Sequence, residues 1–133
     1  MNIHIIGMMN TADRSLALID YALRRRFAFY DLVPAFQSDG FIKYQEGINN
    51  PKFDSLVSII ERLNVEIGKD ASLGDGFRIG HSYFCNCDKI NEQWYKSVLK
   101  YEILPLLDEY WFDNEKQHSK WIKGLLSDEK NPN

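Results

Sequence analysis

The sequence predicts an α+β protein that is mainly helical, with two short strands near its N-terminus and a helical body after them. Residues 3–8 form an apolar run rich in isoleucine, which is typical of a buried strand. Residues 53–67 repeat apolar side chains at the spacing of an amphipathic helix. The composition is 44% hydrophobic and 14% aromatic over 133 residues, which is sufficient for the packed core of one ordinary domain.

The N-terminal part, residues 1–36, is expected to contain a strand, a helix and a second strand. Asp13 or Ser15 can cap the helix, because short polar side chains accept hydrogen bonds from the first helical N–H groups. The helix then ends at three consecutive arginines, where positive charge suits the helix dipole. They are Arg24, Arg25 and Arg26. The alternating aromatic residues within 27–33 predict the second strand, which Pro34 ends.

Two strands do not form a stable sheet by themselves, and an exposed strand edge recruits other chains. We therefore expect the segment 3–33 to pair with a second copy, to exchange with one, or to stay mobile. The helical part has its own periodic apolar faces, so we expect it to fold independently.

Residues 37–126 are expected to form this helical body, and residues 127–133 a disordered polar tail. The first clear helical pattern begins at Pro51. A last amphipathic turn or two is expected within residues 118–126.

The middle of the helical body is interrupted by residues 72–84, which contain three glycines and predict a loop. Asp88 can cap the helix that follows. Pro105 is expected to break or restart that helix, because proline lacks the backbone N–H that a helix interior requires.

The overall charge argues against a broad nucleic-acid-binding surface, since 16 basic and 19 acidic residues leave a net charge of -3. The chain has no apolar run long enough to span a membrane and no signal-peptide pattern at its N-terminus. Two cysteines do not make a disulfide framework. These observations predict a reduced, cytoplasmic protein that does not contact membranes.

A metal site is not expected. His81, Cys85 and Cys87 have a spacing that could begin a zinc site, but a structural zinc ion needs four ligands and no fourth one lies nearby.

Three stretches together resemble one family. "MNTADRSLALIDYALRRRF" (9–27) is similar to the sensor 1 and arginine-finger segment of the McrB-type GTPases, which are AAA+ proteins of modified-cytosine restriction systems. "GFRIGHSYF" (76–84) and "YEILPLLDEYWF" (101–112) are similar to the helical lid of the same proteins. The resemblance covers residues 2–126 and implies the C-terminal part of the AAA+ module: the end of the α/β core, then the lid.

In that family a phosphate loop and an acidic magnesium-binding strand end lie upstream of these segments. The printed sequence contains no G-x-x-x-x-G-K-[ST] motif. We therefore expect no nucleotide hydrolysis by this chain alone.

The resemblance assigns catalytic roles to Asn10, Arg25 and Arg26. It implies that Asn10 orients the attacking water near the γ-phosphate, from the carboxyl end of a strand. Arg25 or Arg26 would act as an arginine finger on the nucleotide of the next subunit, with Arg25 the first choice. Without the resemblance, Asn10 reads as an ordinary turn residue, and the arginines as a charged helix end.

Four further residues are candidates for nucleotide contact: Asp13, Arg14, Arg24 and His81. Asp13 also fits a turn or cap. Arg24 has Asp20 one helical turn earlier as an ion-pair partner. Arg78 and His81 lie where the lid would approach nucleotide, although neither matches a generic sensor 2 pattern.

The resemblance implies a subunit that binds GTP or ATP with magnesium, forms a ring with identical subunits, and works with a nuclease subunit on DNA. Two alternatives remain at this point: a MoxR-like AAA+ chaperone and a non-catalytic helical interaction module. Asn10 and Asp13 also fit the spacing of the N-K-x-D guanine motif, but Thr11 stands where that motif has lysine.

Overall fold

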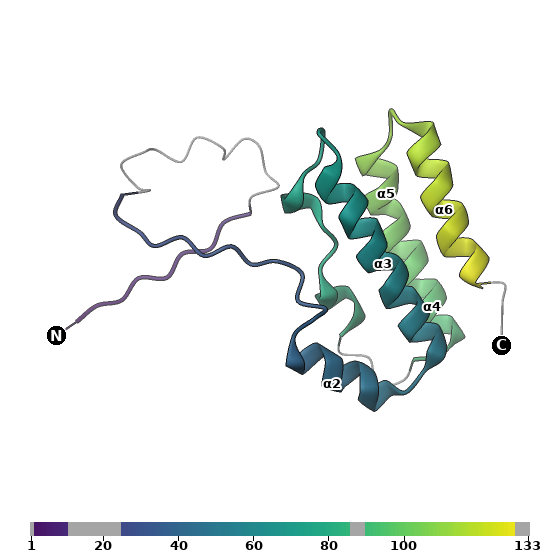
Figure 1. Cartoon of the computed structure of the whole chain (residues 1–133), viewed down its shortest axis with the longest axis horizontal. Helices are drawn as coiled ribbons and strands as arrows, with labels where there is room; N and C mark the ends of the chain where they lie inside the picture. Colours follow the sequence, from purple (N-terminus) through teal and green to yellow (C-terminus); the bar gives the residue numbers. More distant parts are fainter. Residues whose placement is uncertain (1, 11–24, 86–89, 130–133) are drawn as a thin grey trace.

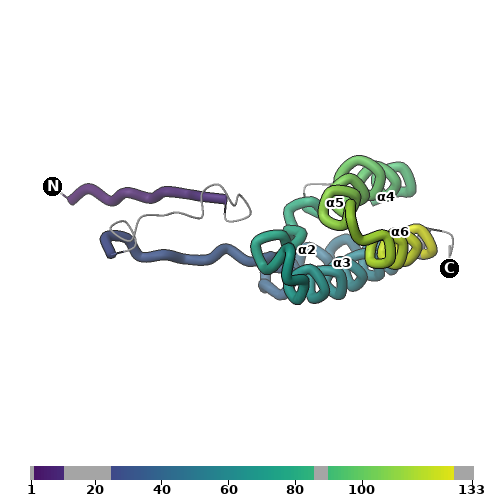
Figure 2. The backbone as a smooth tube through the Cα atoms, turned by 90° about the horizontal axis from the view of Figure 1, so that it is seen from above, coloured from purple at the N-terminus to yellow at the C-terminus, as the bar shows by residue number. Residues whose placement is uncertain are grey.

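The computed structural model of the chain describes residues 2–10, 25–85 and 90–129. Its helical elements are α2 (Asp39–Ile48), α3 (Pro51–Lys69), η2 (Asp75–Phe77), η3 (His81–Phe84), α4 (Glu92–Val98), η4 (Leu99–Ile103), α5 (Leu104–Tyr110) and α6 (Glu115–Glu129). Figure 1 shows α3 and α6 side by side, with α4 and α5 behind them and α2 across one end. Figure 2 shows the same two layers from above. The mainly helical class is therefore confirmed.

The first two helices are set by asparagine and serine caps. The Ser38 hydroxyl accepts a hydrogen bond from the N–H of Phe41 at 3.3 Å and begins α2, which the sequence pattern did not predict. Asn49 ends α2 in the left-handed conformation, at φ +48°, which asparagine tolerates better than most residues. Asn50 then accepts from the N–H groups of Lys52 and Phe53 and begins α3.

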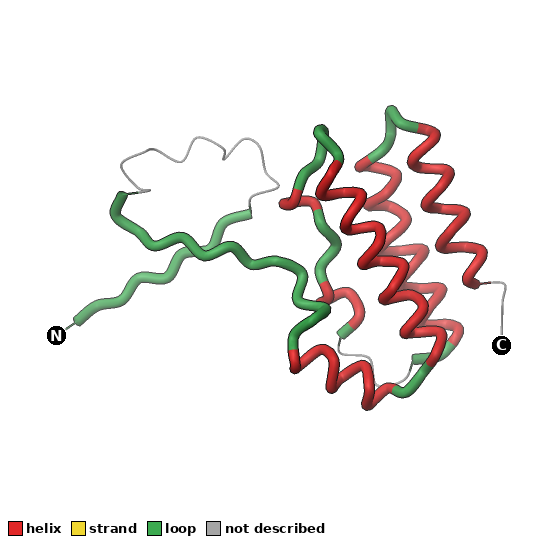
Figure 3. Tube along the Cα trace, viewed as in Figure 1, coloured by secondary structure: helices red, strands yellow, loops and turns green. Residues whose placement is uncertain are grey.

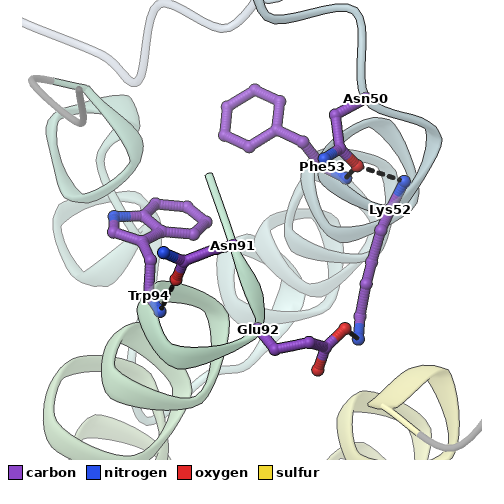
Figure 4. Close-up of polar contacts among 6 residues, drawn as sticks. All are labelled: Asn50, Lys52, Phe53, Asn91, Glu92 and Trp94. Atoms are coloured by element: carbon purple, nitrogen blue, oxygen red, sulfur yellow. Dashed lines mark hydrogen bonds and ion pairs between the residues drawn. The ribbon is translucent and has the colours of Figure 1, made fainter. Parts of the chain in front are cut away.

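The N-termini of α3 and α4 lie close together (Figure 4). Asn91 caps α4, so the predicted cap at Asp88, which lies outside the described residues, is replaced by one three residues later. Lys52 of α3 pairs with Glu92 of α4 at 2.5 Å, and its ammonium lies 4.5 Å from the Tyr95 ring centroid. The hydrogen bond from Lys52 lowers the pKa of Glu92. These contacts hold the two helix starts together.

The sequence predicted that Pro105 would break or restart its helix; the helix is not broken, and α5 begins at Leu104, one residue before the proline. α4 passes into a π-helical segment, η4, and then into α5, with the N–H of Leu104 donating to the carbonyl of Leu99. The wider π turn places the proline near the start of α5, where its missing N–H is tolerated. The backbone therefore continues as one rod.

The core belongs to the helical body. α3 contributes the largest share, on the stripe that the sequence predicted, and η4, α5 and α6 close over it. The most fully buried side chains include Phe53, Leu63, Phe84, Ile103 and Leu125. The first buried residue along the described chain is Phe36.

The two segments expected to be strands are not confirmed. Residues 2–10 and 25–33 run away from the helical body as extended loops, and the described residues contain no strand (Figure 3). Their apolar side chains are exposed, with Ile6 at 92% and Tyr30 at 87%. A strand is defined by its hydrogen-bonded neighbour, and the described chain offers none. The helix expected between these segments lies outside the described residues.

The last helix, α6, is longer than predicted. It begins at Glu115 and ends at Glu129, so residues 127–129 are helical rather than part of the predicted tail. Among the described residues, no helix is both long and apolar enough to cross a membrane.

Asp70 joins the end of α3 to the end of α5. One carboxylate oxygen accepts from the hydroxyl and N–H of Ser72, at 2.5 and 2.8 Å, and the other accepts from the indole N–H of Trp111 at 2.9 Å. The hydrogen bonds from Ser72 and from Trp111 lower the pKa of Asp70.

The lowered pKa makes stability depend on pH in a defined direction. The carboxylate form contributes stability above the ordinary Asp pKa of 3.8, and this contribution is lost as the pH falls through the lower folded value. We expect Asp70→Asn to lower the melting temperature at pH 7 and to have little effect near pH 2. Thermal unfolding of both proteins at the two pH values measures this. An equal difference at both pH values would contradict it.

Candidate functional site

The predicted catalytic residues lie on the two extended segments, apart from the helical core. Asn10 is the last described residue of the first segment, and Arg25 and Arg26 begin the second. All three are exposed. Asp13, Arg14 and Arg24 lie outside the described residues. Exposed guanidinium groups are suited to phosphate oxygens, because each presents a rigid fork of donors.

The His81 side chain lies where the chain passes from the second extended segment into the helical body. Its Nδ1 accepts a hydrogen bond from the backbone N–H of Ala35 at 3.1 Å. Its ring also meets Phe36 and Phe41 edge-on, with centroids 6.1 and 5.9 Å away. A ring nitrogen that accepts must be unprotonated, so this contact requires neutral His81 with its proton on Nε2. The structure thus shows His81 joining η3 to Ala35, just after the arginine-bearing segment 25–33.

A second contact attaches the loop between η2 and η3 to α3. The buried Asn64 of α3 donates from Nδ2 to the carbonyl of Ile79 at 2.8 Å and accepts from the Ile79 N–H at 2.7 Å. One side chain therefore satisfies both backbone groups of a residue in the loop between η2 and η3. Together, Asn64 and His81 fix residues 79–81 relative to α3 and to Ala35.

Arg78 lies in the same loop, next to Ile79. Its guanidinium pairs with Asp75 at 2.6 Å and lies over Gly68 of α3. A Cβ at Gly68 would come within 2.7 Å of Arg78 Nη2, so a larger residue there would displace the Arg78 and Asp75 side chains. Arg78 Nε is buried without a partner among the described residues. The arrangement positions one cation at the lid loop that the sequence had suggested for nucleotide contact.

Sequence reasoning missed Asn64, although the signal was present. Asn64 occupies a position four residues after Ile60 and three before Ile67, on the apolar stripe of α3. A polar side chain at such a position requires hydrogen-bond partners when it is buried. The contact between His81 and Ala35 had no comparable signal.

No group of three or more His, Cys, Asp or Glu side chains in the described ranges could hold a metal ion. Cys85 is a free thiol, partly buried beside the carbonyl of His81, and burial raises its pKa. Cys87 lies outside the described residues, so the predicted absence of a zinc site stays a prediction.

Comparison with known proteins identifies the lid. The family model for the McrB alpha-helical lid domain matches residues 55–119. The Type IV methyl-directed restriction enzyme EcoKMcrB subunit of Escherichia coli (strain K12) is 47% identical over 134 residues. This alignment covers 96% of the chain and 29% of the relative, so the chain spans under a third of that protein's length. The chain is therefore McrB-like over almost its whole length and carries a match to the McrB alpha-helical lid domain.

Proposed function

We propose that this chain is the C-terminal part of the motor module of a McrB-type AAA+ subunit, which hydrolyses GTP or ATP in a modified-cytosine restriction system. The observation that carries the proposal is the 47% identity across 96% of the chain. Because so little of the chain lies outside the alignment, the aligned region includes residues 10–26, where the proposed catalytic side chains lie. The identity also favours the restriction assignment over a MoxR-like chaperone or an interaction module.

In this proposal each candidate residue has a physical role. The Asn10 side-chain oxygen accepts a hydrogen bond from a water molecule and orients that water toward the γ-phosphate. Arg25 or Arg26 extends to the nucleotide of the neighbouring subunit and stabilises charge that develops on the transferred phosphoryl group. Arg24, Arg14 and Asp13 support this segment, and His81 fixes its end against the lid.

The donor groups of this chain fit a nucleotide better than they fit its metal. Exposed arginines suit phosphate oxygens, but no cluster of acidic residues in the described ranges could hold magnesium. Magnesium, when bound, neutralises phosphate charge, and its ligands would come from other parts of the subunit. The ring of subunits, the nuclease subunit, contact with DNA through the complex, and a cytoplasmic location are parts of the same proposal.

Mixed rings test the role in trans. In a longer McrB-family subunit that contains this segment and a phosphate loop, Asn10→Ala and Arg25→Ala should each lower GTP turnover. A mixture of the two variants should recover activity above either one, because some interfaces then combine an intact asparagine from one subunit with an intact arginine from the next. Turnover at several mixing ratios measures this. Mixtures that never exceed the single variants would overturn the role in trans.

A further inference from the structure

We propose that the groove between α3 and α6 binds an acidic segment of a partner protein, with Arg62 and Lys120 receiving its carboxylates. The groove has a volume of about 480 Å³, on the face where these two helices lie side by side (Figure 1). It is distinct from the proposed nucleotide-facing residues, since none of its lining residues comes from the N-terminal segments or the lid loop.

The lining of the groove is basic at its rim and apolar at its floor. Arg62 and Lys120 are exposed, one on each helix, and Ile59 and Trp121 are largely buried. Among the described side chains that line it, none is acidic. A basic, donor-rich groove is notable in a chain with a net charge of -3. The charge pattern is complementary to carboxylates carried beside apolar side chains.

The two cations are only weakly neutralised within the described chain. Arg62 donates a hydrogen bond from Nε to the backbone carbonyl of Ser58, in its own helix, at 3.4 Å. It forms no ion pair with a described residue. Lys120 lies 3.9 Å from Glu66, at the outer limit of an ion pair, and Glu66 is equally distant from Lys69. One carboxylate is therefore shared by two lysines, and Arg62 has none.

Gly124 gives an independent indication that the groove is open. A glycine inside a helix costs about 1 kcal/mol relative to alanine, and packing does not require one here. A Cβ built at Gly124 meets no atom within 4 Å. The space beside Gly124 is therefore open, and no clash with a described residue requires glycine there.

The open shape favours a protein segment over a small molecule or a nucleic acid. Small-molecule sites enclose most of their ligand, whereas this groove lies open between two helices. Nucleic acids need an extended basic surface, whereas Glu66 interrupts the cations here. The Trp121 ring is also covered by the Lys120 ammonium, 5.1 Å from its centroid, which leaves less of it for base stacking.

The test uses a labelled probe peptide of alternating glutamate and leucine, with a glutamine-leucine peptide as its matched control. Fluorescence anisotropy should show binding of the acidic peptide to the full chain. Replacing both cations, Arg62→Gln with Lys120→Gln, should weaken binding about tenfold or more. The control variant, Lys116→Gln with Lys123→Gln, makes the same charge change on α6 outside the groove lining, and should weaken binding less than threefold.

A second variant tests the groove rather than its charge. Gly124→Leu keeps every cation and fills open space, so the protein should remain folded while peptide binding falls by a similar factor. The proposal is overturned if the acidic peptide does not bind, if the glutamine peptide binds as well, or if the two double variants behave alike. It is also overturned if Gly124→Leu binds normally, or if a twelve-nucleotide oligothymidylate binds the same residues more tightly than the peptide.

Discussion

Replacing Arg25 with alanine is expected to lower GTP turnover by about 10³-fold or more in a longer McrB-family subunit that has a phosphate loop. Nucleotide binding should change little, because the proposed contact is made across the subunit interface and is strongest in the transition state. Arg26→Ala should have a similar effect if it, rather than Arg25, reaches the phosphate. Steady-state turnover and binding of a fluorescent GTP analogue separate the two quantities.

The matched control is Lys43→Ala, which removes an exposed positive charge from α2, away from the proposed nucleotide contact. It should retain turnover within a factor of about two. If neither arginine variant differs from this control, neither residue is an arginine finger. If turnover and binding fall together, the arginines hold the ground-state nucleotide instead.

Replacing Asn64 with leucine is expected to lower the free energy of unfolding by about 2 to 6 kcal/mol, since two buried backbone groups of Ile79 each lose a partner at about 1 to 3 kcal/mol. Leucine has the same branching and the same number of side-chain heavy atoms as asparagine, so it removes the hydrogen bonds without leaving a cavity. Urea unfolding measures the change. Val65→Ala, at a neighbouring position of α3 that is 50% exposed, is the control and should change stability much less.

The loss should also be local. Hydrogen exchange should accelerate in residues 75–81 of the Asn64→Leu protein before it accelerates in α5 or α6, because Asn64 holds the loop onto α3. A uniform loss of protection would mean that Asn64 stabilises the whole lid rather than the loop. Unchanged stability would mean that Ile79 finds other partners.

Periodicity predicted the helical body well, because a helix that buries one face carries apolar residues at regular intervals of three and four. The stripe on α3 and the loop with its glycines were predicted in this way. α2 was missed, because it is short, with Phe41 as its one buried residue and Gly40 and Gly47 lowering its propensity. Strands are harder to predict, because they depend on neighbours that the local sequence does not specify.

The spacing of buried residues in the sequence also explains the π turn. Buried residues of the rod from α4 to α5 recur in steps of four: Tyr95, Leu99, Ile103, Leu107 and Trp111. In a regular α-helix each step of four residues turns the side chain by about 40° around the axis, so these five side chains would not all lie on one face. The wider turn of η4 reduces this drift. The sequence therefore contains the signal, but only Pro105 was interpreted.

The proposed catalytic residues were predictable only through family resemblance. Asn10, Arg25 and Arg26 have no periodic pattern that separates a catalytic role from a turn or a charged helix end. Their chemistry depends on a nucleotide and a neighbouring subunit, which local sequence physics does not describe. The groove between α3 and α6 was not predicted, because its residues come from two helices far apart in the sequence, from Ser55 to Ser127.

Because the core begins at Phe36, residues before it and residues after it are subject to different evolutionary constraints. No described residue before Phe36 is buried in it, so substitutions among residues 25–33 should have little effect on the stability of the helical body. Conversely, repacking of the lid can proceed without altering the arginines themselves. The hydrogen bond between Ala35 and His81 crosses this boundary. Selection acting on the lid would therefore reach the arginine segment most directly through that one junction.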